Sequence, residues 1–159
     1  MAIEWKKYKP LLKYHRVLVL SIVLSYIIIK YSGTSGNDTF DNGQLKHEGS
    51  CENGFNEGRW VWYYPNGKKR MTGYFKRGKR SGKWTTYNER EMPVSERSYE
   101  NDKLNGSYCE WYTNGTKKSE GVFRDDKLYG IVKEYDRNGN LVAEEYYENG
   151  LIKKAHLQK

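Results

Sequence analysis

Cysteine and histidine are scarce in this sequence, which has two of the first and three of the second among its 159 residues. The cysteines, Cys51 and Cys109, form neither a CxxC pattern nor another metal-ligand spacing. The histidines, His15, His47 and His156, lie too far apart along the chain for us to expect a shared metal ion or a catalytic triad. The sequence therefore predicts no metal ion and no other cofactor.

Other signatures of catalysis are also missing. Paired carboxylates such as Asp125-Asp126 and Glu144-Glu145 fall where we expect turns or strand edges, whereas a glycosidase needs two carboxylates that face one cleft. Glycine recurs at turn positions and forms no Gly-rich phosphate loop. We therefore expect a protein that is not an enzyme. A secreted enzyme or glycan-binding protein with an aromatic groove is the less favoured alternative.

Proline is nearly absent, with three residues, and hydrophobic residues make up 36% of the chain, yet aromatic residues reach 15%. Because disordered chains are poor in aromatic residues, this composition excludes disorder for the bulk of the sequence. Tyrosine and tryptophan suit pleated surfaces that are half buried and half exposed to water. The composition therefore predicts β structure built from large amphipathic side chains.

A long apolar run occurs once, at residues 17–29, and contains no charged side chain. Residues 1–31 carry six basic side chains and one acidic side chain, whereas the remaining residues have a net charge of +3. More than half of the net charge of +8 thus flanks the apolar run, which argues against nucleic-acid binding. The basic flank before the run consists of Lys6, Lys7, Lys9, Lys13 and Arg16.

We predict that residues 1–31 form a basic flank and a membrane anchor helix, with the bilayer contact at residues 17–29. Flanking basic and tyrosine side chains extend this short run toward the interfaces, and no Ala-x-Ala cleavage site follows it. The positive-inside rule then places the N-terminus in the cytoplasm and the rest outside. Two alternatives stay open, a cleaved signal peptide of a secreted or periplasmic protein and a buried helix of a soluble fold. Residues 32–38 are predicted as a flexible linker.

A period of 24 residues runs through the predicted repeat domain, residues 39–159. Five columns of residues share this step, and the Asn-Gly column is interrupted once, at Arg90-Glu91. The columns are Gly58, Gly82, Gly106 and Gly130; Asn42, Asn66, Asn114 and Asn138, each followed by glycine; Cys51, Phe75, Tyr99, Phe123 and Tyr147; Trp60, Trp84, Tyr108 and Val132; and Tyr63, Tyr87, Trp111 and Tyr135.

Each unit reads as an aromatic strand, a turn and a returning strand, because Asn-Gly tolerates the positive φ of tight turns. The fold class that we predict is an all-β repeat: an elongated antiparallel β-hairpin meander of about ten strands, preceded by one N-terminal hydrophobic helix. Trp60 and Tyr63 have opposite parity, so either both faces carry aromatic rings or a bulge brings the rings together. The units are 59–82, 83–106, 107–130 and 131–154, with a divergent unit at about 35–58.

The pattern Gly-x-Trp-x-x-Tyr-x-x-Asn-Gly, followed by Gly-x-Phe, resembles the variant MORN repeats of bacterial proteins, whose family name refers to an antitoxin component. The clearest match begins at Gly58, and the resemblance covers about residues 40–154. Departures are the Arg90-Glu91 turn, Val132 in the tryptophan column and Glu145 in a glycine column. The resemblance implies a binding or scaffold module with no catalytic residues and with links to membranes and acidic phospholipids. Neutralisation of a partner toxin is the alternative it suggests.

Two surfaces are candidate sites for an unknown protein partner or an anionic lipid. Basic side chains between residues 68 and 83 would attract phosphates, although lysines also protect exposed edges. An aromatic ladder could grip a peptide, a glycan or a second sheet, although its role as packing core is the favoured interpretation. The basic residues are Lys68, Lys69, Arg70, Lys76, Arg77, Lys79, Arg80 and Lys83, and the ladder residues are Trp60, Tyr63, Trp84, Tyr87, Tyr108, Trp111 and Tyr135.

Overall fold

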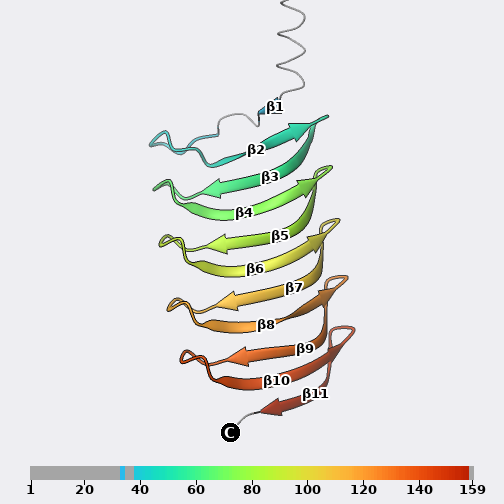
Figure 1. Cartoon of the computed structure of the whole chain (residues 1–159). Helices are drawn as coiled ribbons and strands as arrows, with labels where there is room; N and C mark the ends of the chain where they lie inside the picture. Colours follow the sequence, from blue (N-terminus) through green and yellow to red (C-terminus); the bar gives the residue numbers. More distant parts are fainter. Residues whose placement is uncertain (1–32, 35–37, 158–159) are drawn as a thin grey trace, which may run out of the picture.

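The computed structural model describes residues 33–34 and 38–157, which form one antiparallel sheet of eleven strands. The strands follow one another across the sheet in the order of the sequence, so the topology is a meander (Figure 1). The strands are β1 (Gly33–Thr34), β2 (His47–Glu52), β3 (Phe55–Tyr63), β4 (Lys69–Lys76), β5 (Lys79–Tyr87), β6 (Pro93–Glu100), β7 (Lys103–Trp111), β8 (Lys117–Arg124), β9 (Lys127–Tyr135), β10 (Leu141–Glu148) and β11 (Leu151–Leu157).

The antiparallel meander predicted from the sequence is confirmed. β2 to β11 are the ten strands expected, and β1 adds two residues at one edge. The described residues contain no helix, and therefore none with the length and apolar character that a bilayer crossing requires. The predicted helix and anchor at residues 1–31 lie outside the described residues.

Two rows of turns border the sheet, one at each end of the strands (Figure 1). In the turn after β3, the Asn66 side chain accepts a hydrogen bond from the backbone N–H of Lys68 at 3.1 Å. The irregular turn after β5 is closed in a related way, because the Asn88 side chain accepts the N–H of Arg90 at 2.9 Å. Glu91 there adopts a φ of 61°, in the region that the glycine of Asn-Gly occupies elsewhere. The departure in sequence therefore leaves the hairpin intact.

Glycine with a positive φ bends the odd-numbered strands β3, β5, β7 and β9 near their starts. At Gly82, where φ is 66°, β5 bulges against β4. Thr72 pairs with Thr85, whereas Tyr74 pairs with Ser81, so β5 has two more residues than β4 between these pairs. Because a residue with a side chain is strained at this φ, the glycine column sets the position of this bulge in β3, β5, β7 and β9.

A second glycine column makes room for the tryptophans that follow each bulge. A Cβ atom on Gly73 would lie 2.2 Å from the Trp84 ring, and a Cβ atom on Gly49 would lie 2.2 Å from the Trp60 ring. Each indole N–H donates to a backbone carbonyl of the preceding strand at 3.2 Å. The indoles therefore pack directly on backbone, and the buried apolar residues follow the middle of the sheet. These residues are Trp60, Val61, Trp84, Val132 and Ala143.

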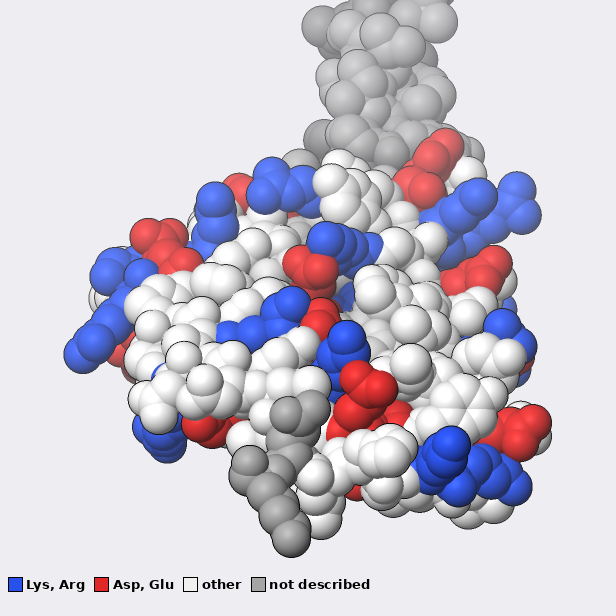
Figure 2. All heavy atoms as spheres, turned by 60° about the horizontal axis from the view of Figure 1, so that its bottom comes forward, with Lys and Arg blue, Asp and Glu red and all other residues white. Residues whose placement is uncertain are grey.

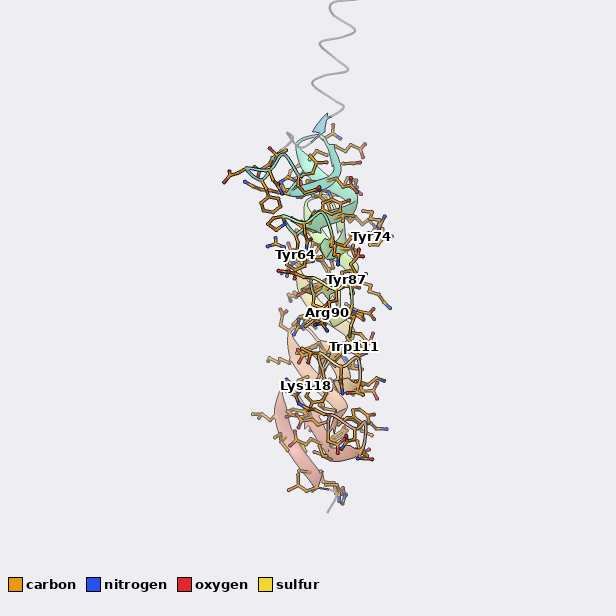
Figure 3. The ribbon with its side chains drawn as sticks, turned by 90° about the vertical axis from the view of Figure 1, so that its left-hand side faces the viewer. Tyr64, Tyr74, Tyr87, Arg90, Trp111 and Lys118 are labelled. Carbon is orange, nitrogen blue, oxygen red and sulfur yellow. The ribbon has the colours of Figure 1, made fainter. Side chains whose placement is uncertain are left out.

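The two aromatic columns of the repeat lie on opposite faces of the sheet. The Trp60 ring contacts Trp62 and Phe75, whereas the Tyr63 hydroxyl donates to Glu48. Glu48 adjoins the glycine under Trp60, so it points to the other face. We call the side of Trp60 the indole face and the side of Tyr63 the phenol face. Figure 3 shows side chains projecting from both sides of this single layer.

The two outer edges of the sheet differ. Along β2 the chain covers its own edge, since β1 pairs with residues 50–51 and Thr39 forms a bridge with Leu45. Between these contacts, the N–H of Lys46 donates to the carbonyl of Asp38 at 2.8 Å. At the opposite edge, β11 pairs with β10 and with no other strand of residues 33–34 and 38–157. Part of the predicted linker, β1, thus belongs to the edge of the sheet.

Candidate binding surfaces

A continuous row of aromatic rings crosses the N-terminal half of the indole face, from β2 to β6. Neighbouring ring centroids are 5.0 to 6.2 Å apart, within the range of favourable aromatic contacts. Phe75 meets Trp84 edge-on at 89°, and Trp62 is tilted against Trp84 by 35°. The row contains His47, Trp60, Trp62, Phe75, Trp84 and Tyr99.

Arg97 ends this row on β6. It stands in the second glycine column and pairs across the strands with Tyr108 of β7. Its guanidinium group lies 2.6 Å from the Glu110 carboxylate. At this position of the preceding repeats an indole packs on the backbone of a glycine, whereas here the ion pair takes that space. Beyond it, Tyr108 and Phe123 form a separate contact with their ring centroids 5.0 Å apart.

Where the row ends, the indole face is hollowed into an open groove of about 400 Å³. Trp62, Phe75 and Trp84 supply aromatic surface to it. Arg80 lines it too, with its guanidinium carbon 4.2 Å from the Tyr99 ring. Hydrogen bonds from the backbone and side chain of Arg80 lower the pKa of the neighbouring carboxyl of Asp102. Both arginines that line this groove, Arg80 and Arg97, therefore already form ion pairs with carboxylates.

The seven residues of the predicted aromatic ladder do not form one surface. Trp60 and Trp84 are 4% and 7% exposed, so these two indoles serve as packing core. Tyr64, which the sequence analysis did not single out, joins successive repeats along one row of turns, since its hydroxyl donates to the carbonyl of Tyr87 at 2.8 Å (Figure 3). The indole-face members are Trp60, Trp84 and Tyr108, and the phenol-face members are Tyr63, Tyr87, Trp111 and Tyr135.

Tyrosine and glutamate side chains pair on the phenol face at both ends of the sheet. Near the C-terminal end, Glu120 accepts hydrogen bonds from Lys117 and Tyr135, both at 2.7 Å. These two donors lower the pKa of Glu120. The hydrogen bond between Tyr135 and Glu120 also raises the pKa of Tyr135. Near the N-terminal end, burial and the bond to Glu48 raise the pKa of Tyr63 to about 12.

The predicted basic cluster is divided between the two rows of turns. Two of its side chains are in ion pairs, since Arg80 lies 3.2 Å from Asp102 and Lys83 lies 2.7 Å from Glu96. The other six form no ion pair within the described part of the chain. Lys and Arg side chains are interspersed with Asp and Glu in Figure 2. Lys68, Lys69 and Arg70 lie at the turn before β4, Lys76, Arg77, Lys79 and Arg80 lie at the turn after it, and Lys83 lies on β5.

Several members of the aromatic row were missed in the sequence. Trp62 has the parity of Trp60, and this spacing alone would have placed both rings on one face. Phe75 and Tyr99 were recognised as a column of the repeat, but the face of that column depends on how β4 and β6 pair with their neighbours, which the sequence alone did not give. Arg97 could have been recognised in the sequence as an exception, because it interrupts the series of glycines that begins at Gly49 and recurs every 24 residues.

Neither cysteine nor a metal cluster contributes a site in the part of the chain that the structure describes. No group of three or more His, Cys, Asp or Glu side chains in these residues could hold a metal ion. Cys51 and Cys109 are free thiols on β2 and β7, each half-buried. Burial raises the pKa of the Cys109 thiol, which disfavours the reactive thiolate.

Three segments of the chain match the MORN repeat variant, at residues 56–77, 104–125 and 128–149. No curated protein matches the chain. The unmatched stretch between the first two segments contains the Arg90-Glu91 turn and Arg97. The repeat pattern is thus weakest where the aromatic row ends. Repeats of this kind are consistent with a binding or scaffold module.

Proposed function

We propose that this chain is a membrane-anchored scaffold that presents its repeat sheet at an anionic bilayer surface. The matches to the MORN repeat variant support a binding role, and a single-layer sheet leaves two faces and two rows of turns accessible to partners. In this proposal residues 17–29 insert into the bilayer, the basic flank stays in the cytoplasm and the repeats lie outside. Cleavage after the apolar run would instead release a secreted or periplasmic form.

The proposal rests on the basic side chains at both ends of β4. Six of them lack an ion pair in the described residues, and each basic side chain near an anionic surface contributes about 1 kcal/mol to binding. From Lys69 to Lys76 an extended strand covers roughly 23 Å, so one small anion cannot reach both groups. A lipid surface can. We call Lys69, Arg70, Lys76 and Lys79 the β4 cations.

Co-sedimentation of the full chain with vesicles tests this function. We expect salt-sensitive binding to vesicles that contain phosphatidylserine, in addition to binding to neutral vesicles through residues 17–29. Replacing the four β4 cations by glutamate should abolish the anionic preference and leave binding to neutral vesicles unchanged. Replacing Val19 and Val23 by arginine should abolish binding to neutral vesicles.

The repeat provides a matched control two units later. Lys117, Lys118, Arg124 and Lys127 occupy on β8 and β9 the positions of the β4 cations. Three of these four are engaged, since Lys117 and Lys118 approach carboxylates and Arg124 stacks over the Tyr129 ring. Their replacement by glutamate should disturb the anionic preference far less. An equal loss in both variants, or no loss in either, would contradict the role of the β4 cations.

A further inference from the structure

β11 has an exposed edge in the described part of the chain. All seven of its residues are exposed, and the apolar Leu151, Ile152 and Leu157 are 64%, 53% and 78% exposed. One side of the strand pairs with β10, and the backbone N–H and C=O groups on its other side face no strand of residues 33–34 and 38–157. Such a row of unpaired backbone groups is a template for pairing with another chain.

The side chains of β11 are sorted between the two faces. Ile152, Ala155 and Leu157 pair with β10 residues of the indole face, whereas Leu151 pairs with Glu148 on the phenol face, so three of the four apolar side chains lie on the indole side. Lys154 and His156 pair with β10 residues of the phenol face. Along β11 these two residues alternate with Ala155 and Leu157 of the indole face. Along residues 152–157, a strand added to this edge would therefore meet apolar side chains on the indole face and basic side chains on the phenol face.

The opposite edge of the sheet shows how an outer strand of this protein is covered. β1 pairs with residues 50–51, and Thr39 forms a bridge with Leu45 beside β2. An extended segment of the chain thus takes the place of a further strand at that edge. Stacking a second copy of the sheet on β2 would require removal of this segment, whereas β11 needs no such rearrangement.

We propose that β11 binds an extended segment of a partner protein as an additional antiparallel strand. The partner segment alternates apolar residues, which extend the indole face beside Ile152 and Leu157, with acidic residues, which face Lys154. This inference rests on the scaffold function and deepens it by naming the class of partner segment. Backbone pairing supplies affinity in this mode of recognition, and the alternating side chains supply specificity.

A second copy of this chain fits the edge less well. Two β11 strands that pair antiparallel about a two-fold axis bring the central lysines of both copies together, because an isologous interface repeats each residue. Lys153 and Lys154 lie at the centre of the strand, so this pairing places like charges opposite each other. An acidic segment meets the opposite charge instead.

Peptide binding to the full chain tests the proposal. The probes are fluorescent peptides of about ten residues, at the upper end of the usual length of a strand. The first alternates valine and glutamate, the second alternates valine and lysine, and the third has the composition of the first with its valines grouped. Fluorescence anisotropy should show the first peptide binding at least about tenfold more tightly than the other two. Equal binding of the first and third peptides would overturn the proposal, because alternation would then play no part.

Two single substitutions locate the binding site. Lys154→Glu should weaken the valine–glutamate peptide by about fivefold, since a cross-strand attraction becomes a repulsion. Lys118→Glu makes the same charge change at an exposed position on an internal strand, β8, and should leave peptide affinity unchanged. Equal effects of the two substitutions would mean that the peptide senses overall charge and would overturn the site on β11.

The same variants separate this inference from the scaffold function. Lys154→Glu should retain the preference for anionic vesicles, and the variant without the β4 cations should retain the peptide. Analytical ultracentrifugation of the full chain without peptide tests whether a second copy of the chain binds at β11 instead, since it measures whether the protein dimerises. A dimer that Leu157→Lys dissociates would assign this edge to a second copy and overturn the partner-segment proposal.

Discussion

The two halves of the indole face share one backbone plan and differ in their packing. From β2 to β6, Trp60 and Trp84 rest on glycine backbone and join a continuous row of rings. From β7 to β10 the corresponding positions hold Tyr108 and Val132, and the row is interrupted by Arg97. The bulge glycines continue through both halves, and each hairpin is retained, including the one with the irregular turn at Arg90-Glu91. Strand geometry in this sheet therefore does not depend on the aromatic row.

The comparison assigns separate tasks to the two glycine columns. The glycines with positive φ shape the strand, so they recur in each of the odd-numbered strands β3 to β9. The other column only has to be empty of a side chain where an indole lies above it. Where the ring from the following strand is smaller, a larger residue is tolerated there: Arg97 stands beside Tyr108.

The largest expected difference between the halves concerns the buried rings themselves. Trp84→Ala should lower the free energy of unfolding by about 4 kcal/mol, because it removes a ring that contacts neighbours on both sides. Val132→Ala, at the same repeat position and equally buried, should cost about 2 kcal/mol. Urea unfolding of the full chain, followed by circular dichroism, measures both. Equal losses would contradict the stabilising role given to the continuous row of rings.

A smaller difference is expected from filling the glycine column. In Gly73→Ala the new methyl group would lie 2.2 Å from the Trp84 ring, so the indole must move, at a cost of about 3 kcal/mol. In Gly121→Ala the closest atom is Tyr108 Cε1 at 2.8 Å, and the smaller neighbours can yield at a cost of about 1 kcal/mol. Thermal unfolding of the two variants ranks them. A ranking in the opposite order would contradict the proposed task of this column.

The smallest expected effect is a difference in pH dependence between the phenol-face pairs. Lys117 helps to lower the pKa of Glu120, so this carboxylate stabilises the fold above its unfolded pKa and the contribution is lost as pH falls through the lowered folded pKa. Leu45 stands at the position of Lys117 near the other end, where Tyr63 has its pKa raised from 10.0 to about 12. That contribution is present below pH 10 and is lost as pH rises toward 12.

Urea midpoints as a function of pH distinguish these two cases. Glu120→Gln should lose less stability than the parent chain on acidification, and Tyr63→Phe should lose less on alkalinisation. The reverse assignment, with acid sensitivity at the Tyr63 end, would contradict the role given to Lys117.

Most of the fold could be predicted from the 24-residue period of the sequence. Positive φ at Gly82 and the Asn-Gly turns are local requirements of the backbone, so they can be read from residue type alone. The face of each ring could not be derived, because a bulge with one extra residue would have reversed the parity of the strand, whereas the observed bulge has two extra residues and preserves it. The open edge at β11 also escaped the sequence, since pairing depends on what lies beside a strand and not on its own residues.

The basic cluster illustrates the same limit at the candidate site. Eight cations in one short stretch of sequence suggest one patch, but a strand separates its two ends by its full length. Lys68 and Arg77 therefore lie in opposite rows of turns. Arg80 and Lys83 form ion pairs with Asp102 and Glu96, so they are not free to bind an anionic partner. These partners come from the next hairpin, and no local sequence pattern indicates them.

The identical order of strands in sequence and in space has a mechanical consequence. Each strand touches its sequence neighbours, so a pulling force applied between β2 and β11 acts across the sheet and not along its strands. Hydrogen bonds loaded in this direction open in succession from an edge. The sheet should therefore lengthen one hairpin at a time and regain each hairpin when the load is released. A partner held at β11 would be connected to the other end of the protein by an extensible tether.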